Sequence, residues 1–293
     1  MTRPEPAARR ARSLPPAERV RRRLAEAAGP AVAAEMPAGY HRFGRVLVVQ
    51  RPPSLARYDE LLGTAWQREL GVATVLVKSG PVDGELRTPQ LKRIAGESTE
   101  TEVVEHGVRW RFDAARIMFA AGNRTERWRV GRLVRPGESV VDLFAGIGYF
   151  AIPAALPGRA ARVVAVEKNP VAVRYLRENA EVNGVASRLV IVPGDNRTVT
   201  LPLAEFDRAI LGYLPSALPW VARAVALLRP SGGWLHVHTV ADVRAPLSEA
   251  AAAVEVSATR AGAAPTEPSH VRRVKPYGPG RNHLVVDARV ARR

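Results

Sequence analysis

The stretch VVDLFAGIGYF, residues 140–150, decides the fold of this chain. Apolar residues surround Asp142 as in a short buried strand, and Ala145-Gly146-Ile147-Gly148 then predicts a turn before a further apolar run. Glycine lets such a turn be tight and leaves its backbone N–H groups open to a ligand. We therefore expect a strand that ends at Asp142, a turn that meets a ligand at Gly146, and a helix after it.

Short strands rich in Val, Ile and Leu alternate with helical segments after Pro136. The expected strands are residues 139–143, 162–167, 189–193, 207–211, 233–239 and 283–290. The expected helices are residues 149–156, 171–182 and 217–228, and residues 249–260 fit either helix or strand. This alternation predicts an α/β fold with a doubly wound, Rossmann-like sheet.

Two more of these strands are followed by polar side chains at the same edge of the sheet. Glu167 closes the second strand, where a carboxylate can accept from both hydroxyls of a ribose. Asp195 and Asn196 follow the third strand, where Asp195 can accept from the exocyclic amine of an adenine. Because ligands of doubly wound sheets lie beyond the carboxyl ends of the strands, these residues predict an adenosine-containing ligand.

The glycine turn alone leaves two cofactor classes open. Gly146, Gly148 and Ala151 also satisfy the G-x-G-x-x-G/A spacing of a dinucleotide-binding turn. No second phosphate-binding turn is apparent, so the pattern favours S-adenosylmethionine. A dehydrogenase that uses a dinucleotide is the alternative from another enzyme class, and mass spectrometry of a bound cofactor would separate the two.

The chain is strongly cationic. It has 44 Lys+Arg and 28 Asp+Glu among 293 residues, a formal net charge of +16. Arginine greatly outnumbers lysine, and a guanidinium binds phosphate and stacks on bases well, so we expect a nucleic-acid partner. A general arginine bias is the alternative, because charge speaks to association and not to fold.

One late segment combines cations with an aromatic ring. Arg272, Arg273, Lys275 and Tyr277 are suited to an RNA backbone and an exposed base. A solvated basic loop is the alternative interpretation. We expect these four residues to bind RNA.

Several other classes of protein are disfavoured. The chain has no cysteine, which excludes disulfide frameworks and thiol nucleophiles. The longest apolar stretch, residues 140–156, contains an acid, glycines and a proline, so we expect no membrane span and a cytoplasmic location. His236 and His238 share one face of a strand, but no third ligand is near them in the sequence, so we expect no metal site.

The sequence divides into four parts. Residues 1–43 are expected to be a basic, partly disordered segment, either a solvated tail or a polyanion-binding arm, with a short helix from Pro16. Residues 44–113 predict a small α+β domain, and residues 137–293 the Rossmann-like domain. Between them, residues 114–136 form a linking region, where an asparagine followed three residues later by a glutamate predicts a capped helix.

Several separated motifs resemble one enzyme family. The runs FDAARIMFAAGNRTERWRV, VVDLFAGIGYFAI, VEKNP, GDNR, LGYLPSA and RRVKPYGPGRNHLVVD are similar, in this order, to those of the wybutosine-synthesising 3-amino-3-carboxypropyltransferases that act on phenylalanine tRNA. These enzymes are relatives of the tRNA guanine-37 N1-methyltransferases. Both groups have a class I S-adenosylmethionine-dependent fold preceded by a small α+β domain. The resemblance covers about residues 45–290.

The resemblance implies an enzyme that transfers the aminocarboxypropyl group of S-adenosylmethionine to 4-demethylwyosine at position 37 of tRNA(Phe), in the anticodon region. Arg127 is then expected near the methionine part of the donor, Glu167 at the ribose, and Asp195 with Asn196 at the adenine. Ala120 stands where the family usually has a serine. The expected cofactor-binding residues are Ala120, Arg127, Asp142, Gly146, Glu167, Asp195, Asn196 and Gly212. No catalytic acid or base stands out.

Two segments favour the transferase over the methyltransferase. In the methyltransferases, the entry to the linking helix has a sequence like Ser-Pro-Arg-Leu. Their fourth strand ends in a sequence like Asn-Leu-Pro. Here Gly122-Asn123 and Gly212 occupy those places, and Gly212 has no side chain with which to orient a base. A tRNA (guanine-37 N1) methyltransferase is the alternative function, and a non-catalytic RNA-binding module is a third.

Overall fold

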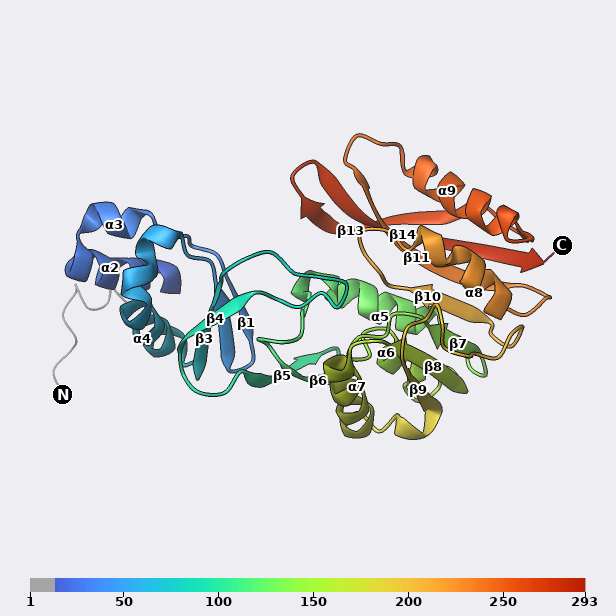
Figure 1. The fold of residues 1–293 in the computed structure, drawn as a ribbon, viewed down its shortest axis with the longest axis horizontal. Helices are drawn as coiled ribbons and strands as arrows, with labels where there is room; N and C mark the ends of the chain where they lie inside the picture. The colour runs from blue at the N-terminus through green and yellow to red at the C-terminus, as the bar shows by residue number, and fades with distance from the viewer. Residues whose placement is uncertain (1–13, 293) are drawn as a thin grey trace. The chain divides into compact units, whose positions relative to one another are not determined.

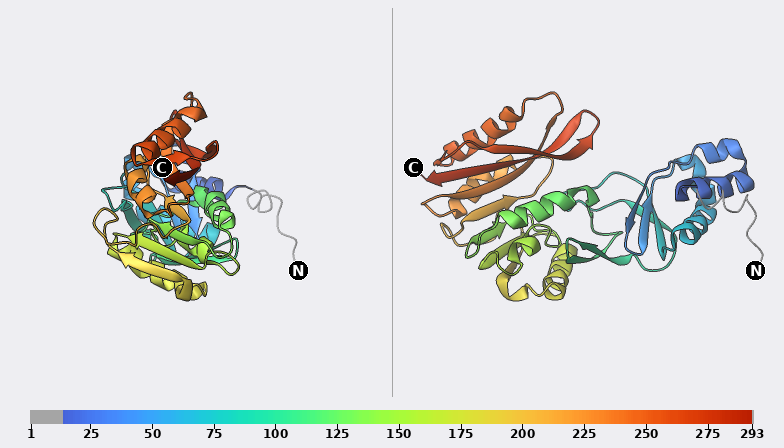
Figure 2. Two further views of the ribbon diagram at one scale, coloured as in Figure 1. Left: turned by 90° about the vertical axis from the view of Figure 1, so that its right-hand side faces the viewer. Right: turned by 180° about the vertical axis from the view of Figure 1, so that it is seen from behind.

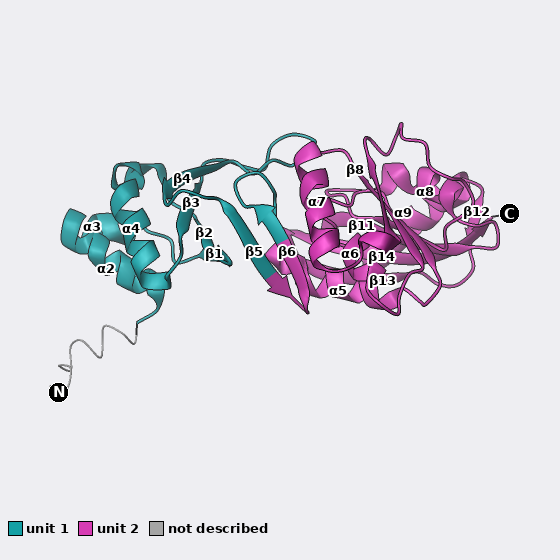
Figure 3. Ribbon diagram, turned by 90° about the horizontal axis from the view of Figure 1, so that it is seen from below, with its two compact units in different colours: residues 1–103, 111–119 teal, residues 104–110, 120–293 magenta. Residues whose placement is uncertain are grey.

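The computed structural model describes residues 14–292, and the chain forms two compact units (Figure 3). Unit 1 comprises Met1–Val103 and Arg111–Phe119, and unit 2 comprises Val104–Trp110 and Ala120–Arg293. The hairpin of β5 (Glu100–Glu105) and β6 (Val108–Asp113) contributes to both units. The units therefore divide the chain at other places than the borders expected at residues 43, 113 and 136.

Unit 1 is a small α+β unit with helices against a sheet (Figure 1). Its elements are α2 (Pro16–Ala28), α3 (Pro30–Ala34), β1 (Tyr40–Phe43), β2 (Val46–Val49), η1 (Pro53–Tyr58), α4 (Asp59–Leu70), β3 (Thr74–Lys78) and β4 (Leu91–Ala95). The sheet order is β1-β2-β3-β4, and only β2 and β3 run parallel. Apolar side chains of α2, α4, β2 and β3 form its core.

Residues 16–43 belong to this unit, and α2 begins at Pro16, where the sequence predicted a short helix. Val20 and Leu24 of α2 are fully buried and pack in the same core as Trp66 of α4. Arg19 and Arg23 lie on the helix beside them, and both pair with Glu69 of α4. The abundant arginines obscured an apolar stripe at helical spacing. The expectation for residues 1–13 lies outside the described residues.

In the described residues, unit 2 is built on one eight-stranded sheet, which confirms the Rossmann-like fold class. Its elements before the fourth parallel strand are η2 (Ala121–Asn123), α5 (Arg124–Leu133), β7 (Ser139–Asp142), α6 (Ala151–Ala155), β8 (Arg162–Glu167), α7 (Pro170–Val182), η3 (Ala186–Arg188) and β9 (Leu189–Pro193). The remaining elements are β10 (Arg208–Leu211), η4 (Leu218–Trp220), α8 (Val221–Leu227), β11 (Gly233–Asp242), α9 (Leu247–Arg260), β12 (Ala263–Pro265), β13 (His270–Gly278) and β14 (Arg281–Arg292).

The strand order of this sheet is β12-β14-β11-β10-β7-β8-β9, and β13 pairs with β14. Five neighbouring strands of this order, β11, β10, β7, β8 and β9, run parallel to one another. β14 is antiparallel to β11. The order reverses at β7, where one half of the sheet continues to β8 and the other to β10. That is the switch point at which doubly wound sheets bind ligands.

Helices cover both faces of the unit 2 sheet (Figure 2). α8 and α9 pack on the apolar side chains of one face, and α9 shows that the ambiguous residues 249–260 form a helix. α6 and α7 pack on the other face, with α5 beside α6. No helix within residues 14–292 is long and apolar enough to cross a membrane.

Candidate functional site

The carboxyl ends of the parallel strands bring the predicted ligand-binding residues together. Asp142 is the last residue of β7 and Glu167 the last of β8, and Asn196 follows β9. Backbone and side-chain hydrogen bonds join these ends: the N–H of Ala145 donates to the carbonyl of Val166 at 2.9 Å. The side-chain amide of Asn196 donates to the carbonyl of Leu143, the residue after β7, at 2.8 Å. The sheet topology therefore places three separate motifs at one edge.

The turn after β7 has the backbone geometry that the sequence predicted. Gly146 has φ +57°, and a Cβ there would lie 2.8 Å from the Tyr149 ring, so the position suits glycine alone. The Gly146 N–H donates to Oε2 of Glu167 at 2.7 Å. Oε1 of the same carboxylate accepts from the Asn169 N–H at 2.7 Å. Glu167 thus holds the glycine turn and the start of α7 with a single carboxylate.

Burial changes the acidity of both strand-end carboxyls. Asp142 is completely buried, and burial raises its pKa to about 7 against the hydrogen bond that Phe144 N–H donates to it. Glu167 nearby contributes to that rise by charge repulsion. Burial likewise raises the pKa of Glu167, opposed by the backbone hydrogen bonds that it accepts. Within residues 14–292, Oδ2 of Asp142 has no hydrogen-bond partner.

The loop after β9 presents one paired and one unpaired polar group. Asp195 accepts from Arg197 and from Lys168, the latter at 3.1 Å, and these hydrogen bonds hold its pKa below the usual range. Asn196 is 6% exposed, and its Oδ1 has no partner in the described part of the chain. An unpartnered, buried amide oxygen can accept from a ligand amine or hydroxyl.

Arg127 is buried beside the glycine turn. Its guanidinium pairs with Glu105 and donates to the Ala120 carbonyl at 2.9 Å. It also lies 5.5 Å from the centre of the Tyr149 ring, which packs on Gly146. Arg127 therefore connects the backbone of Ala120, another predicted site residue, with the glycine turn. Glu105 was missed because nothing in the local sequence joins it to an arginine 22 residues later.

The predicted capping interaction at the start of α5 is wrong. Asn123 occupies the N-cap position, but its side chain makes no capping hydrogen bond. Glu126 instead pairs with Arg129, one turn further along the helix, and is 1% exposed. Arg129 also pairs with Asp287 of β14, so the tertiary contact with the sheet decides where Glu126 points.

Aromatic rings that the sequence did not single out lie beyond β7 and β10. Phe144 and Tyr213 stack with their centres 5.1 Å apart, and Trp220 meets Phe144 edge-on at 5.1 Å. Beside them, a Cβ at Gly212 would lie 2.9 Å from the Phe150 ring. Phe150 thus fills the space that a side chain at position 212 needs.

The four residues expected to bind RNA lie on β13, which is a strand paired with β14 and not a loop. Arg272 and Arg273 are exposed, and Tyr277 is 39% exposed. Lys275 is partly buried, and its side chain packs on Gly122 of η2, close to the segment that precedes α5.

His236 and His238 share one face of β11, as expected, and both are buried by partners. His236 contacts Asp287 at 2.5 Å and Arg208 at 2.6 Å. His238 contacts His283 of β14 at 2.8 Å. Among the described residues, no group of three or more His, Cys, Asp or Glu side chains is arranged to hold a metal ion.

Comparison with known proteins identifies two domains. Residues 101–263 match the family described as the TRM5/TYW2 methyltransferase domain, and residues 20–99 match the TYW2 N-terminal domain. The first match covers more than half of the chain and confirms the resemblance seen in the sequence.

Individual relatives agree with these matches. The chain is 34% identical, over 87% of its length and 90% of the other, to a Pyrococcus horikoshii protein named tRNA(Phe) (4-demethylwyosine(37)-C(7)) aminocarboxypropyltransferase. It is 35% identical to the Arabidopsis thaliana tRNA wybutosine-synthesizing protein 2/3/4, but spans only 26% of that protein.

A solved structure of the same kind covers both domains. The structure of P. horikoshii TYW2 in complex with MeSAdo has a TM-score of 0.80 and 29% identity, and covers 94% of this chain and 99% of that one. The glycine turn and the strand-end acids lie within the residues that match the first of these domains. The chain belongs to the TRM5/TYW2 family and carries the TYW2 type of N-terminal domain.

Proposed function

We propose that this protein transfers the 3-amino-3-carboxypropyl group of S-adenosylmethionine to C7 of 4-demethylwyosine at position 37 of tRNA(Phe). The observation that carries this proposal is the similarity along nearly the whole chain, N-terminal domain included, to an enzyme named for that transfer. The packing at Gly212 supports it, because Phe150 occupies the place where the methyltransferase relatives are expected to have an asparagine side chain.

The residues at the strand ends fit the donor. Glu167 has the ionisable carboxylate that a ribose needs, and the unpartnered Oδ1 of Asn196 can accept from a nucleoside donor. Asp195 retains acceptor capacity for the adenine amine beside its two cations. Arg127 places positive charge next to the glycine turn, where it can face the carboxylate of the methionine part. Asp142, Gly146, Gly212 and the Ala120 backbone complete this surface.

The acceptor base is proposed to stack on the rings of Phe144, Tyr213 and Trp220. C7 of the base attacks the γ-carbon of the methionine chain, the sulfur–γ-carbon bond breaks, and methylthioadenosine leaves with the bonding electrons. The ring then loses the proton from C7. Which of the three activated carbons reacts depends on alignment with the nucleophile, so the protein selects the product by positioning.

The tRNA is expected to present its anticodon region, since the target base adjoins the anticodon, and the reaction is expected in the cytoplasm. Basic residues on β13 are proposed to contact the RNA. Arg272, Arg273 and Tyr277 are exposed there, and Lys275 packs near the entry to α5.

The test uses S-adenosylmethionine labelled separately in its methyl and its carboxyl carbon, with tRNA(Phe) that carries 4-demethylwyosine. We expect carboxyl label in the tRNA and release of methylthioadenosine. A matched tRNA with unmodified guanine 37 should take up neither label. Methyl label in either tRNA, with release of S-adenosylhomocysteine, would replace this proposal with the guanine-37 methyltransferase.

A further inference from the structure

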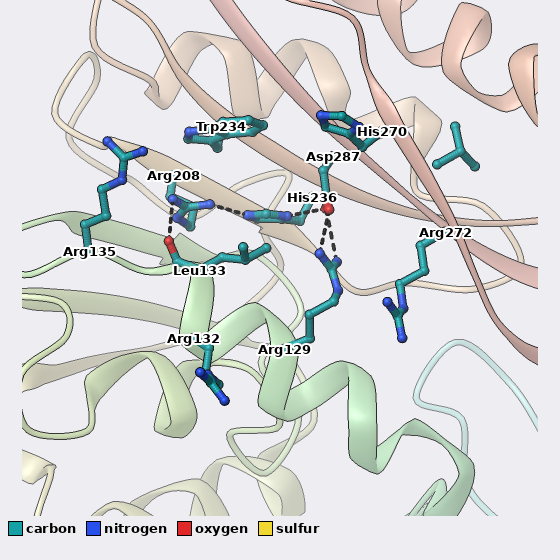
Figure 4. A pocket seen from close by; sticks show the side chains of 11 residues that line it. Arg129, Arg132, Leu133, Arg135, Arg208, Trp234, His236, His270, Arg272 and Asp287 are labelled. Atoms are coloured by element: carbon teal, nitrogen blue, oxygen red, sulfur yellow. Dashed lines mark hydrogen bonds and ion pairs between the residues drawn. The ribbon is translucent and has the colours of Figure 1, made fainter.

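Unit 2 contains an arginine-lined pocket (Figure 4), and no residue of the glycine turn lines it. Its volume is about 550 Å³, within the size range of small-ligand pockets. Residues of α5, β10, β11, β13 and β14 form its walls. The residues that matter here are Arg129, Arg132, Arg135, Arg208, Arg272 and Trp234. Arg208 begins β10 and Trp234 is near the start of β11, so the pocket lies toward the amino ends of these strands.

Part of the pocket is held rigid by paired charges. Arg129 pairs with Asp287, whose carboxylate contacts Nδ1 of His236 at 2.5 Å. Nε2 of His236 accepts from Arg208 at 2.6 Å, so the ring is neutral and its Nδ1–H donates to Asp287. Arg208 also pairs with Glu138 at 2.9 Å. Figure 4 shows the links from Arg129 to Arg208 as one continuous chain.

The remaining arginines have little or no counter-charge. In residues 14–292, no acid pairs with the side chain of Arg132 or Arg135, and both residues are exposed. Arg272 lies 3.8 Å from Glu126, which already binds Arg129. The pocket therefore has an excess of positive charge that an anion would neutralise.

This excess charge continues toward the donor site. β13 runs beside η2 and α5, because Lys275 packs on Gly122 while Arg272 lies near Glu126, one turn further along. From Arg127, next to the glycine turn, α5 extends about 9 Å to Leu133 at 1.5 Å per residue, and Arg135 follows two residues later. Cationic side chains thus line a path from the neighbourhood of the donor to the pocket.

We propose that the pocket binds the phosphate backbone of the anticodon stem-loop of the tRNA through Arg132 and Arg135. Arg272 closes the site from β13, and Trp234 offers an aromatic face on which a neighbouring base can stack. The paired Arg129 and Arg208 set the position of the walls without using their charge on the ligand. The proposal rests on the proposed function only in taking tRNA as the ligand.

The experiment compares two double variants with the same loss of charge. R132Q/R135Q removes the unpaired pocket arginines. The control, R177Q/R260Q, removes exposed arginines of α7 and α9 that line no part of the pocket. Affinity for tRNA(Phe) and for its anticodon stem-loop is measured by fluorescence anisotropy over a range of salt concentrations, and methylthioadenosine affinity by calorimetry.

We expect R132Q/R135Q to weaken binding of both RNAs about tenfold and to reduce the slope of log affinity against log salt by about 0.7 for one lost single-strand phosphate contact. R177Q/R260Q should change neither the RNA affinity nor the salt slope by a comparable amount. Methylthioadenosine should bind equally to the natural protein and to both double variants. An effect equal to that of the control, or loss seen with full tRNA but not with the stem-loop, would overturn the proposal.

A small free anion such as inorganic phosphate is the other ligand that suits these arginines. If inorganic phosphate raises the melting temperature of the natural protein but not of R132Q/R135Q, while RNA affinity is unchanged, the pocket binds small anions and the RNA proposal fails. The binding readouts do not depend on which group is transferred. A failure of the labelling experiment would therefore leave this result intact, and the reverse holds too.

Discussion

At the scale of single residues, Glu167 shows how one carboxylate joins two elements of the candidate site. Its two oxygens accept from the N–H groups of Gly146 and Asn169, each at 2.7 Å. These bonds fix the turn after β7 and the start of α7 while leaving lone pairs of the carboxylate open. Hydrogen bonds to a charged acceptor are stronger than those to a neutral one.

Replacing Glu167 by glutamine should weaken donor binding. The new amide would turn an NH₂ group toward one of the two backbone donors, and the charge that favours ribose hydroxyls would be lost. Charged hydrogen bonds contribute about 1.5–3 kcal/mol, so methylthioadenosine affinity should fall at least tenfold in calorimetry. The matched control is E205Q, which removes an exposed carboxylate. An equal loss of tRNA affinity in E167Q would contradict the ribose assignment.

At the scale of elements, α2 shows how an arginine-rich segment becomes part of a core. Pro16 suits the first turn of a helix, where its missing N–H is not needed. Val20 and Leu24 then fall on one face, toward α4. The arginines on the flanking positions pair with Glu69, so the helix is basic and packed at once.

The variant L24A tests this packing. Truncating a fully buried leucine should lower the free energy of unfolding of unit 1 by about 2–5 kcal/mol, because apolar burial is lost and a cavity remains. R22A, on the exposed side of the same helix, should change it by less than about 0.5 kcal/mol. Urea unfolding of the full chain, followed by tryptophan fluorescence, to which Trp66 of unit 1 contributes, measures both. Equal effects would mean that α2 does not contribute to the core.

At the scale of the whole molecule, buried histidines make folding sensitive to acid. Burial lowers the pKa of His238 and of His283 to about 3, from 6.5. It also lowers the pKa of His236, against the opposing effect of Asp287. The folded state therefore binds fewer protons than the unfolded chain at mildly acidic pH. Asp142, with its pKa raised to about 7, acts in the opposite direction between pH 3.8 and 7.

The net expectation is that stability falls as the pH decreases below 6.5. A lowered histidine pKa contributes stability that is present above the unfolded value and is lost progressively toward about pH 3. The three histidines outnumber the two carboxyls with a raised pKa, Asp142 and Glu167. Asp287, whose pKa is lowered by His236 and Arg129, adds to the loss only below about pH 3.8. Urea unfolding between pH 4 and 8 measures it.

Two histidine variants separate the cause. H283N should flatten the dependence on pH, whereas H270Q, at an exposed position, should leave it as in the natural protein. Stability that is constant from pH 7 to pH 4.5 would contradict the role assigned to the buried histidines.

Local patterns were enough to predict the elements that carry the candidate site because each of these elements is local. The strand, the glycine turn and the helix over residues 140–150 follow from apolar periodicity and from the backbone freedom of Gly146. Strand-end acids such as Glu167 meet at one edge because parallel strands share their direction. The same reasoning failed at Glu126, whose capping role was predicted from spacing. Glu126 instead pairs with Arg129 of the same helix, and Arg129 in turn pairs with Asp287 of β14.

The sequence by itself thus determined the fold class, the strand ends that carry the candidate site and the family resemblance, because periodicity, turn residues and motif order are encoded within short segments. Only the tertiary structure decided the partners of the buried charges. Arg127 with Glu105 are 22 residues apart, His236 with Asp287 are 51 apart, and Arg129 with Asp287 are 158 apart. No local spacing joins such pairs, because packing of helix against sheet brings them together and burial then requires each charge to find a partner.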